Sequence, residues 1–192
     1  MIKINLPVSE ADIRKLKMGD EVSLNGIMLT GRDSAHTWLL NEKPKEVREL
    51  LKDSVIYHCG PVVKKVGDEW HFVAAGPTTS IREEPFQGPV IKEYGIRGVM
   101  GKGGMGEKTL QALNEHGAVY LHAVGGAATL QAQAVKKVHG VLKLEDFGVP
   151  EAMWIIEVKD FQAVVTMDSH GNSLHKTIKA GSDKIANELI GI

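Results

Sequence analysis

Three hydroxyl side chains and an arginine lie together in Thr78-Thr79-Ser80-Ile81-Arg82, directly after Gly76-Pro77. The preceding apolar run, 70–75, predicts a strand that Gly-Pro ends. Ser80 and Glu83 have capping-box spacing, which predicts the start of a short helical turn. Backbone N–H groups at such a start, with a hydroxyl and a guanidinium, suit an anion such as a carboxylate. A plain helix cap beside a solvated arginine is the alternative.

Two further cations occupy the same kind of position. Arg32 stands in Gly31-Arg32-Asp33-Ser34-Ala35-His36, and Lys102 stands in Gly101-Lys102-Gly103-Gly104-Met105-Gly106, each after an apolar run. Either one alone is typical of a surface charge. Together with Arg82, on three loops that follow three strands, they predict a site for a dianion. Because one charge-assisted hydrogen bond contributes about 1.5–3 kcal/mol, three are enough to hold a small dicarboxylate.

The glycine-rich loop around Lys102 matches the nucleotide-binding motifs poorly. A P-loop carries its lysine at the end of the loop, whereas Lys102 is at the start of this one. Gly101, Gly103 and Gly106 have dinucleotide-motif spacing, but no acidic residue clearly ends a following strand about twenty residues later. A non-catalytic nucleotide- or anion-binding module stays open as an alternative. A structural subunit, whose glycine turns only pack strands against helices, is another.

The segment Asp168-Ser169-His170-Gly171-Asn172-Ser173 holds an acid, a hydroxyl and an imidazole. Neighbouring residues do not make catalytic-triad geometry, and the sequence contains no Gly-x-Ser-x-Gly elbow. We predict a polar loop here that shapes or closes a site.

Composition and charge argue against several classes of function. The 192 residues carry a formal net charge of −1, which argues against a nucleic-acid partner. No apolar stretch reaches the roughly 18 residues of a membrane span, and residues 1–7 lack the core of a signal peptide, so we expect no membrane partner and a cytoplasmic protein. The single cysteine, Cys59, is expected to be a buried strand end and cannot ligate an iron–sulfur cluster alone. None of the eight histidines has zinc-helix spacing, so we assign no metal ligand.

The apolar periods predict one mixed α/β domain over residues 1–192, β-rich in its first half. There we expect a strand at 21–30 interrupted by a hairpin turn at Asn25-Gly26, a helix capped by Asp33, and strands at 55–58, 62–66 and 70–75. In the second half strands alternate with glycine turns and helices, which is typical of parallel α/β units. The expected helices are 89–94, 107–116, 127–138 and 182–190, and the expected strands are 96–100, 118–124, 154–158 and 163–167.

Five motifs occur in order along nearly the whole chain. They are Gly31-Arg32-Asp33-Ser34-Ala35-His36, His58-Cys59-Gly60-Pro61-Val62-Val63, Gly76-Pro77-Thr78-Thr79-Ser80-Ile81-Arg82, Gly101-Lys102-Gly103-Gly104-Met105 and Asp168-Ser169-His170-Gly171-Asn172-Ser173-Leu174. Together they resemble the β subunit of the two-subunit iron–sulfur hydro-lyases, class I fumarase and L-tartrate dehydratase, which corresponds to the C-terminal domain of single-chain class I fumarases. The resemblance implies a swivelling β/β/α domain. It also implies an α subunit that supplies three cysteines to a [4Fe–4S] cluster, in an α2β2 assembly with homodimeric association.

The same resemblance implies roles for individual residues. Thr78 matches the family's catalytic base, and Arg32, Arg82 and Lys102 match its substrate-carboxylate ligands. The implied reaction is the reversible hydration of fumarate to (S)-malate, with the open iron as Lewis acid for the hydroxyl and the cations stabilising developing charge.

Several alternatives to these roles stay open. Thr79 is the alternative working hydroxyl, and L-tartrate dehydratase, whose β subunit shares every motif quoted, is the alternative activity. Ile81 and Glu83-Glu84 depart from the family's pattern of a small residue before the arginine and a methionine after it. We expect this departure to bear on substrate preference.

Overall fold

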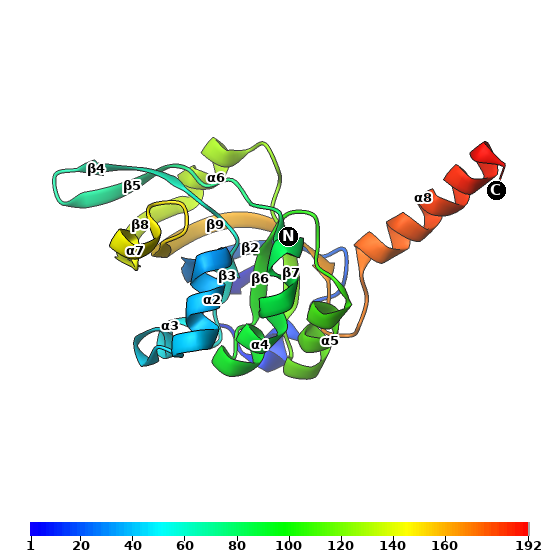
Figure 1. The fold of residues 1–192 in the computed structure, drawn as a ribbon, viewed down its shortest axis with the longest axis horizontal. Helices are drawn as coiled ribbons and strands as arrows, with labels where there is room; N and C mark the ends of the chain where they lie inside the picture. The colour runs from blue at the N-terminus through cyan, green and yellow to red at the C-terminus, as the bar shows by residue number, and fades with distance from the viewer. Residues whose placement is uncertain (192) are drawn as a thin grey trace.

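The computed structural model describes residues 1–191, and its centre is a seven-stranded sheet. The strands of the sheet are β1 (Ile2–Asn5), β2 (Glu21–Thr30), β3 (Val55–Tyr57), β6 (Gly98–Gly101), β7 (Val119–His122), β8 (Val135–Leu142) and β9 (Met153–Met167). Their order is β1-β2-β3-β6-β7-β9-β8, with the first five parallel and β8 and β9 antiparallel to their neighbours. Because β9 also pairs with β2, the sheet closes on itself (Figure 1). The predicted mixed α/β class is confirmed, and the swivelling subtype stays a prediction.

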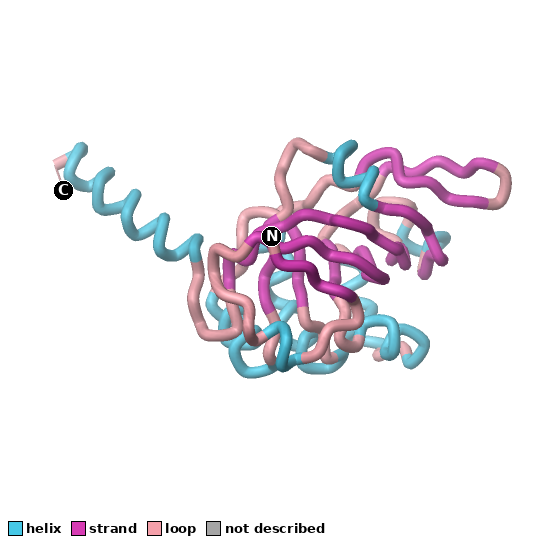
Figure 2. Tube along the Cα trace, turned by 180° about the vertical axis from the view of Figure 1, so that it is seen from behind, coloured by secondary structure: helices cyan, strands magenta, loops and turns pink. Residues whose placement is uncertain are grey.

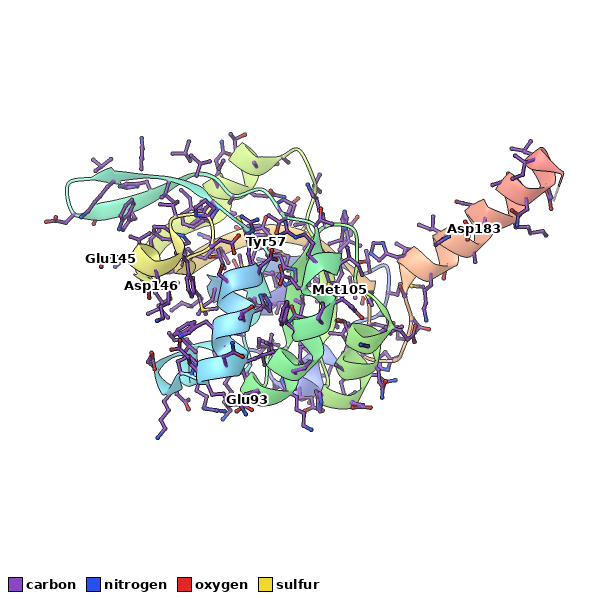
Figure 3. All side chains as sticks on the ribbon, in the orientation of Figure 1. Tyr57, Glu93, Met105, Glu145, Asp146 and Asp183 are labelled. Atoms are coloured by element: carbon purple, nitrogen blue, oxygen red, sulfur yellow. The ribbon has the colours of Figure 1, made fainter. Side chains whose placement is uncertain are left out.

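Helices cover one side of the parallel strands, as Figure 1 shows for α2, α4 and α5. The helices and 3-10 turns are α1 (Glu10–Ile13), α2 (Asp33–Glu42), η1 (Lys45–Val47), α3 (Arg48–Leu51), η2 (Ser80–Glu83), α4 (Glu84–Tyr94), α5 (Glu107–His116), α6 (Ala128–Ala134), α7 (Leu144–Phe147) and α8 (Leu174–Ile190). Strand β3 is apolar throughout because both of its faces are buried. Ile56 belongs to the apolar cluster under the helices, and Val55 and Tyr57 belong to the cluster on the other side. Tyr57, labelled in Figure 3, therefore lies inside the body of the molecule.

Two elements extend away from this body. The hairpin of β4 (Val62–Val66) and β5 (Glu69–Ala74) turns at the predicted Gly67-Asp68, and α8 leads away on the opposite side in both views (Figures 1 and 2). Helix α8 starts at Leu174, eight residues before the predicted start, and bears the exposed apolar side chains Ile178, Ile185 and Leu189. No helix within residues 1–191 is both long and apolar enough to span a membrane.

The predicted hairpin turn at Asn25-Gly26 is wrong, because β2 runs through it as one strand with a bulge. Strand β9 pairs with β2 on both sides of the irregularity, which keeps the two halves in one strand. Gly26 has φ +112, and a Cβ there would come 2.5 Å from the C=O of Leu6. The glycine therefore marks a bulge under close backbone approach and not a chain reversal.

Four predictions of where elements begin or end are also wrong. The helix expected over 127–138 ends at Ala134, because the following residues pair with β9 as strand β8. The two late strands expected at 154–158 and 163–167 form one continuous strand, β9. Helix α4 begins at Glu84, so Pro89 lies inside it and not at its start. Asp33 is the first residue of α2 and not its cap; Arg32 holds the cap position without a capping side chain.

Candidate active site

The segment Pro77–Ser80 lies in the fork where β3 and β6 separate. Pairing between these strands ends with the hydrogen bond from the N–H of His58 to the C=O of Met100 (2.7 Å). Beyond it, the N–H of Thr78 donates to the C=O of His58 (2.8 Å), and the N–H of Lys102 donates to the C=O of Thr78 (3.1 Å). Both backbone groups of Thr78 are held by strand ends, which fixes this residue at the carboxyl edge of the sheet.

Thr79 and Lys102 form the last pair of this arrangement. They make a parallel bridge, and the N–H of Ser80 donates to the C=O of Lys102 (3.0 Å). Paired residues of adjacent strands project to the same face, so Thr79 and Lys102 share one face and Thr78 shares the other with Ser80. Thr79 and Lys102 are exposed, Thr78 is half-buried and Ser80 is buried. Among residues 1–191, Lys102 forms no ion pair.

Arg32 follows the neighbouring strand and lies against the base of the fork. The N–H of Gly31 donates to the C=O of Tyr57 (2.9 Å), which carries the β2–β3 pairing up to this point. One guanidinium nitrogen of Arg32 is 3.1 Å from the carboxylate of Glu151. A Cβ added to Gly60 would come 2.6 Å from the same nitrogen, so the glycine leaves room for the guanidinium.

Arg82 joins the group through Asp33, with whose carboxylate it forms an ion pair. The carboxyl groups of Asp33 and Glu83 share a hydrogen bond. Burial, with the neighbouring Asp33, raises the pKa of Glu83 to about 9, and the hydrogen bond from Glu83 holds the pKa of Asp33 below its ordinary value. At neutral pH Glu83 is therefore protonated and Asp33 is charged, so the pair with Arg82 persists.

The structure thus brings all four predicted site residues to one edge of the sheet. Arg32 follows β2, Thr78 fills the fork after β3, Lys102 follows β6, and Arg82 lies beside the Arg32 loop through Asp33. Ligands of parallel α/β sheets bind at this carboxyl edge. A hollow of about 470 Å³ lies elsewhere, between α6 and β9, and none of the four residues lines it.

Ser80 does not cap the turn that it begins, so the capping-box prediction is wrong. Residues 80–83 do form a short 3-10 turn, but its cap position, Thr79, makes no side-chain capping hydrogen bond. The Ser80 oxygen instead lies in the interior, 2.9 Å from Nδ1 of His58 and 2.8 Å from the hydroxyl of Tyr120.

Glu84 has a role that the sequence analysis missed. Its carboxylate accepts from the N–H groups of Gly106 (2.7 Å) and Thr109 (3.1 Å) and from the Thr109 hydroxyl (2.7 Å). It therefore caps the N-terminus of α5 from another helix and ties down the glycine-rich loop. No local spacing gives this cap away, because donor and acceptor are more than twenty residues apart in the sequence.

The polar loop at 168–173 does not lie with the four candidate residues. The Asp168 carboxylate accepts from the N–H groups of Met18, His170 and Asn172 and from the side-chain amide of Asn172, all at 3.0–3.1 Å. Strand β9 runs antiparallel to β7, so the loop begins at the opposite edge of the sheet. It binds its own backbone and the turn after α1.

Cys59 does not fit an iron–sulfur cluster. Its side chain is fully buried as predicted, and burial raises the pKa of the thiol. Within the described part of the chain, no group of three or more His, Cys, Asp or Glu residues is arranged to hold a metal ion.

Comparison with known proteins assigns a family. Residues 1–178 match the family model described as the fumarase C-terminus. This chain belongs to the fumarase C-terminal family. It is 57% identical, over 184 residues, to a putative fumarate hydratase class I of Geobacillus stearothermophilus. That alignment covers 95% of this chain but 35% of the relative, so the chain spans about a third of that protein's length.

Two further relatives match this chain over most of their own length. A putative L(+)-tartrate dehydratase subunit beta of Methanocaldococcus jannaschii is 43% identical over 96% of both chains. The L(+)-tartrate dehydratase subunit beta of Escherichia coli K12 is 36% identical over 89% of this chain and 85% of its own. The fumarase C-terminal unit therefore occurs both within a longer chain and as a separate subunit, and the family predicted from the five motifs is confirmed.

Proposed function

We propose that this chain is the β subunit of a class I iron–sulfur hydro-lyase that reversibly hydrates fumarate to (S)-malate. The observation that carries the proposal is the fork, in which both backbone groups of Thr78 are bound to strand ends and cations follow the strands on either side. Three cations at one edge of the sheet suit a small dianion. The fumarate hydratase name of a relative that shares 57% of the aligned residues supports the reaction class.

Arg32, Arg82 and Lys102 would bind the two carboxylates of the substrate. Arg32 and Arg82 each have a carboxylate partner in this chain, Glu151 and Asp33. A guanidinium has five N–H donors, so each arginine keeps donors for a substrate oxygen while its partner holds it in place. Lys102 brings an exposed ammonium group from the other side of Thr78.

Thr78 would act as the base in the dehydration direction. Its oxygen takes the proton from the carbon next to one carboxylate of malate, the C–H electrons form the double bond, and hydroxide leaves from the adjacent carbon. A threonine oxygen is a weak base in water, so this role requires that Arg32 and Arg82, when they bind the substrate, stand close enough to favour its ionised form. The cations also stabilise the negative charge that grows on the carboxylate as the proton leaves. Hydration is the same path in reverse.

The rest of the site would come from an α subunit. We propose that its three cysteines carry a [4Fe–4S] cluster, because Cys59 is buried and its thiol is held protonated. When bound, the cluster supplies a Lewis acid for the substrate hydroxyl. The full assembly would be a cytoplasmic α2β2 enzyme with homodimeric association.

L-Tartrate dehydratase is the second candidate activity. Relatives with that name align over nearly their whole length with this chain, as expected for the same kind of subunit. The departures noted from the family pattern separate into two kinds. Glu83 and Glu84 have structural partners, whereas Ile81 is half exposed beside Arg82. Any effect on substrate preference would therefore come from Ile81.

Co-expression with the α partner tests this proposal. After anaerobic cluster reconstitution, the complex should hydrate fumarate and dehydrate (S)-malate faster than it dehydrates L-tartrate. A preference for tartrate would favour L-tartrate dehydratase as the activity. Activity of this chain alone would contradict an active site that is divided between two subunits. Tight ATP binding by the isolated chain would favour the nucleotide-binding module instead.

A further inference from the structure

A chain of buried polar side chains lies beneath the candidate site, and the mechanism above leaves it without a role. Its members are His36, Gln87, His58, Ser80 and Tyr120, each with 0% of its surface exposed. At one end, Nδ1 of His36 lies 2.9 Å from the C=O of Arg32. At the other end, the Tyr120 oxygen accepts from the N–H of Gly104 (3.3 Å). The chain therefore joins the Arg32 loop to the Lys102 loop.

Between these ends every contact is at hydrogen-bond distance. The amide of Gln87 lies between two rings, 3.0 Å from Nε2 of His36 and 2.8 Å from Nε2 of His58. Nδ1 of His58 is 2.9 Å from the Ser80 oxygen, which is 2.8 Å from the Tyr120 hydroxyl. Ser80 thus connects this buried hydrogen-bond network to the segment Thr78-Thr79-Ser80, called the hydroxyl segment below.

The order of protons along this chain follows from its ends. Burial lowers the pKa of both histidines, that of His58 to about 3, so both rings are neutral. The C=O of Arg32 only accepts, so His36 carries its proton on Nδ1 and presents a bare Nε2 to Gln87. With Oε1 of Gln87 between the rings, Nε2 of Gln87 has no partner. Exchanging the two ends of the amide gives each ring one N–H donor.

The same order assigns the contacts of His58. His58 then has a bare Nε2 and a protonated Nδ1, so it donates to the Ser80 oxygen. His58 consequently holds the hydroxyl segment twice, since its C=O accepts from the N–H of Thr78 and its ring donates to Ser80. Tyr120 ties the same Ser80 to Gly104, two residues beyond Lys102.

We propose that Gln87, His58 and Tyr120 are positioning residues, which hold Thr78 at a fixed spacing from Arg32 and Lys102 for the hydration reaction. The inference rests on the proposed function. These contacts between the loops are buried hydrogen bonds, which water cannot reach. Catalysis is sensitive to such spacing, because a misplacement of about 1 Å lowers rates by about 100-fold.

A pair of tyrosine variants separates positioning from stability. Tyr120→Phe removes the hydrogen bond to Ser80. Tyr94→Phe is the control, because it removes a hydroxyl that is also buried but donates to the C=O of Leu39 (2.8 Å) and contacts none of the five buried polar side chains. Both should lower the urea midpoint of the full chain by similar amounts. In the reconstituted complex, Tyr120→Phe should lower kcat about tenfold with KM within about twofold, and Tyr94→Phe should leave kcat unchanged. Equal kcat values for the two variants would overturn the proposal.

Gln87→Glu adds a pH-dependent test. A carboxylate only accepts, so both rings must then present Nε2–H, and His36, which also donates from Nδ1, must be a cation. The other titratable groups that act on this ring are Glu83, whose Oε2 lies 3.6 Å from Nδ1, and the carboxylates of Asp33 and Glu151. The carboxylate raises the pKa of that ring, so the proper geometry holds below this pKa and is lost as the pH rises through it. The kcat of Gln87→Glu should therefore fall toward high pH relative to the wild type, whereas Gln87→Met should be slow at every pH. A Gln87→Glu profile that superimposes on the wild type would contradict the proposed proton order.

Nitrogen NMR of the full polypeptide with labelled histidines tests the same proton positions independently of enzymatic activity. His36 and His58 should both be protonated at Nδ1 and bare at Nε2 at neutral pH. An Nε2–H tautomer on either ring overturns the inference, whatever the activity. A wild-type complex without hydratase activity contradicts the proposed function instead, so the two failures are distinguishable.

Discussion

Two polar loops in this chain carry similar residues but differ in what their groups bind. In the loop that begins at Asp168, the carboxylate accepts four N–H donors, three from the backbone and one from Asn172. At the fork, backbone groups are also satisfied, but Thr79 and Lys102 remain exposed. The difference shows which loop has capacity for a ligand, because the carboxylate of the first loop is fully used within the chain and the second loop has donors left over.

The comparison also shows how each loop is held. Asp168 organises its loop from within, through residues that are close in sequence. The fork is held from below and from the side, by His58, Glu84 and Tyr120 on other elements. A ligand-binding loop needs such support from outside, since its own side chains must stay free for the substrate.

Replacing Thr78 is expected to have the largest effect on activity, because it tests whether the fork is the catalytic loop of the two. Thr78→Ala in the reconstituted complex should lower kcat by about 100-fold or more with little change in KM, because it removes a proton acceptor that acts in the transition state. Thr79→Ala is the matched variant, since it removes a neighbouring hydroxyl from the other face of the segment. A larger loss of kcat in Thr79→Ala would assign the base to Thr79.

Replacing Arg32 should weaken binding more than chemistry. Arg32→Met removes one charge-assisted pair with the substrate, which corresponds to a rise in KM of roughly 10- to 100-fold. Arg48→Met is the control, because Arg48 is likewise paired to a carboxylate, that of Glu93 at 2.6 Å, but far from the fork. Steady-state kinetics on malate would contradict the assignment if both variants had the same KM.

Replacing Asp168 should affect stability and leave kcat unchanged. Burial alone would raise the pKa of Asp168, but hydrogen bonds from Asn172 and the backbone of Met18 outweigh it and hold the pKa below its ordinary value. The stabilisation is therefore present above the unfolded pKa and is lost as the pH falls through the folded pKa. Asp168→Asn should cost about 2 kcal/mol in urea unfolding at pH 7 and less below about pH 4. A lowered kcat in the folded variant would indicate that this loop takes part in the active site.

The smallest effect is expected at Glu83. Its raised pKa, about 9, means that its stabilisation is full below the unfolded pKa and is lost as the pH rises through the folded one. Glu83→Gln keeps a donor for Asp33 and removes the ionisable group. The variant should gain stability relative to the wild type in urea unfolding as the pH rises from 5 to 8, because only the wild type must keep a carboxyl group protonated in the folded state. Parallel pH–stability curves would contradict a protonated Glu83.

Much of this site could be predicted because its parts are local in sequence. Arg32 and Lys102 each follow a short apolar run, and the carboxyl ends of parallel strands meet at one edge, so the convergence follows from the strand order. The helix predicted over 127–138 includes the first residues of β8, because residues 135–138 form a strand only through their pairing with β9, a long-range contact.

The supporting residues could not be predicted for the same reason. His58 and Gln87 are 29 residues apart, and Ser80 and Tyr120 are 40 apart, so their contacts leave no spacing pattern in the sequence. Ser80 was interpreted from its nearest acidic neighbour, Glu83, and its true partners come from β7 and the end of β3.

The β4–β5 hairpin departs from the fold and rejoins it at nearly the same point, because Cys59 pairs with Pro77 across its base. Its tip at Gly67 has no neighbouring atoms within 4 Å of an added Cβ. Trp70 and Phe72 of β5 pack on Trp154, so the strands of the arm are held in place and only the turn at Gly67 has room for a foreign peptide. The tip of this arm is accordingly a suitable attachment point for a reporter group that follows docking to a partner without disturbing the chemistry.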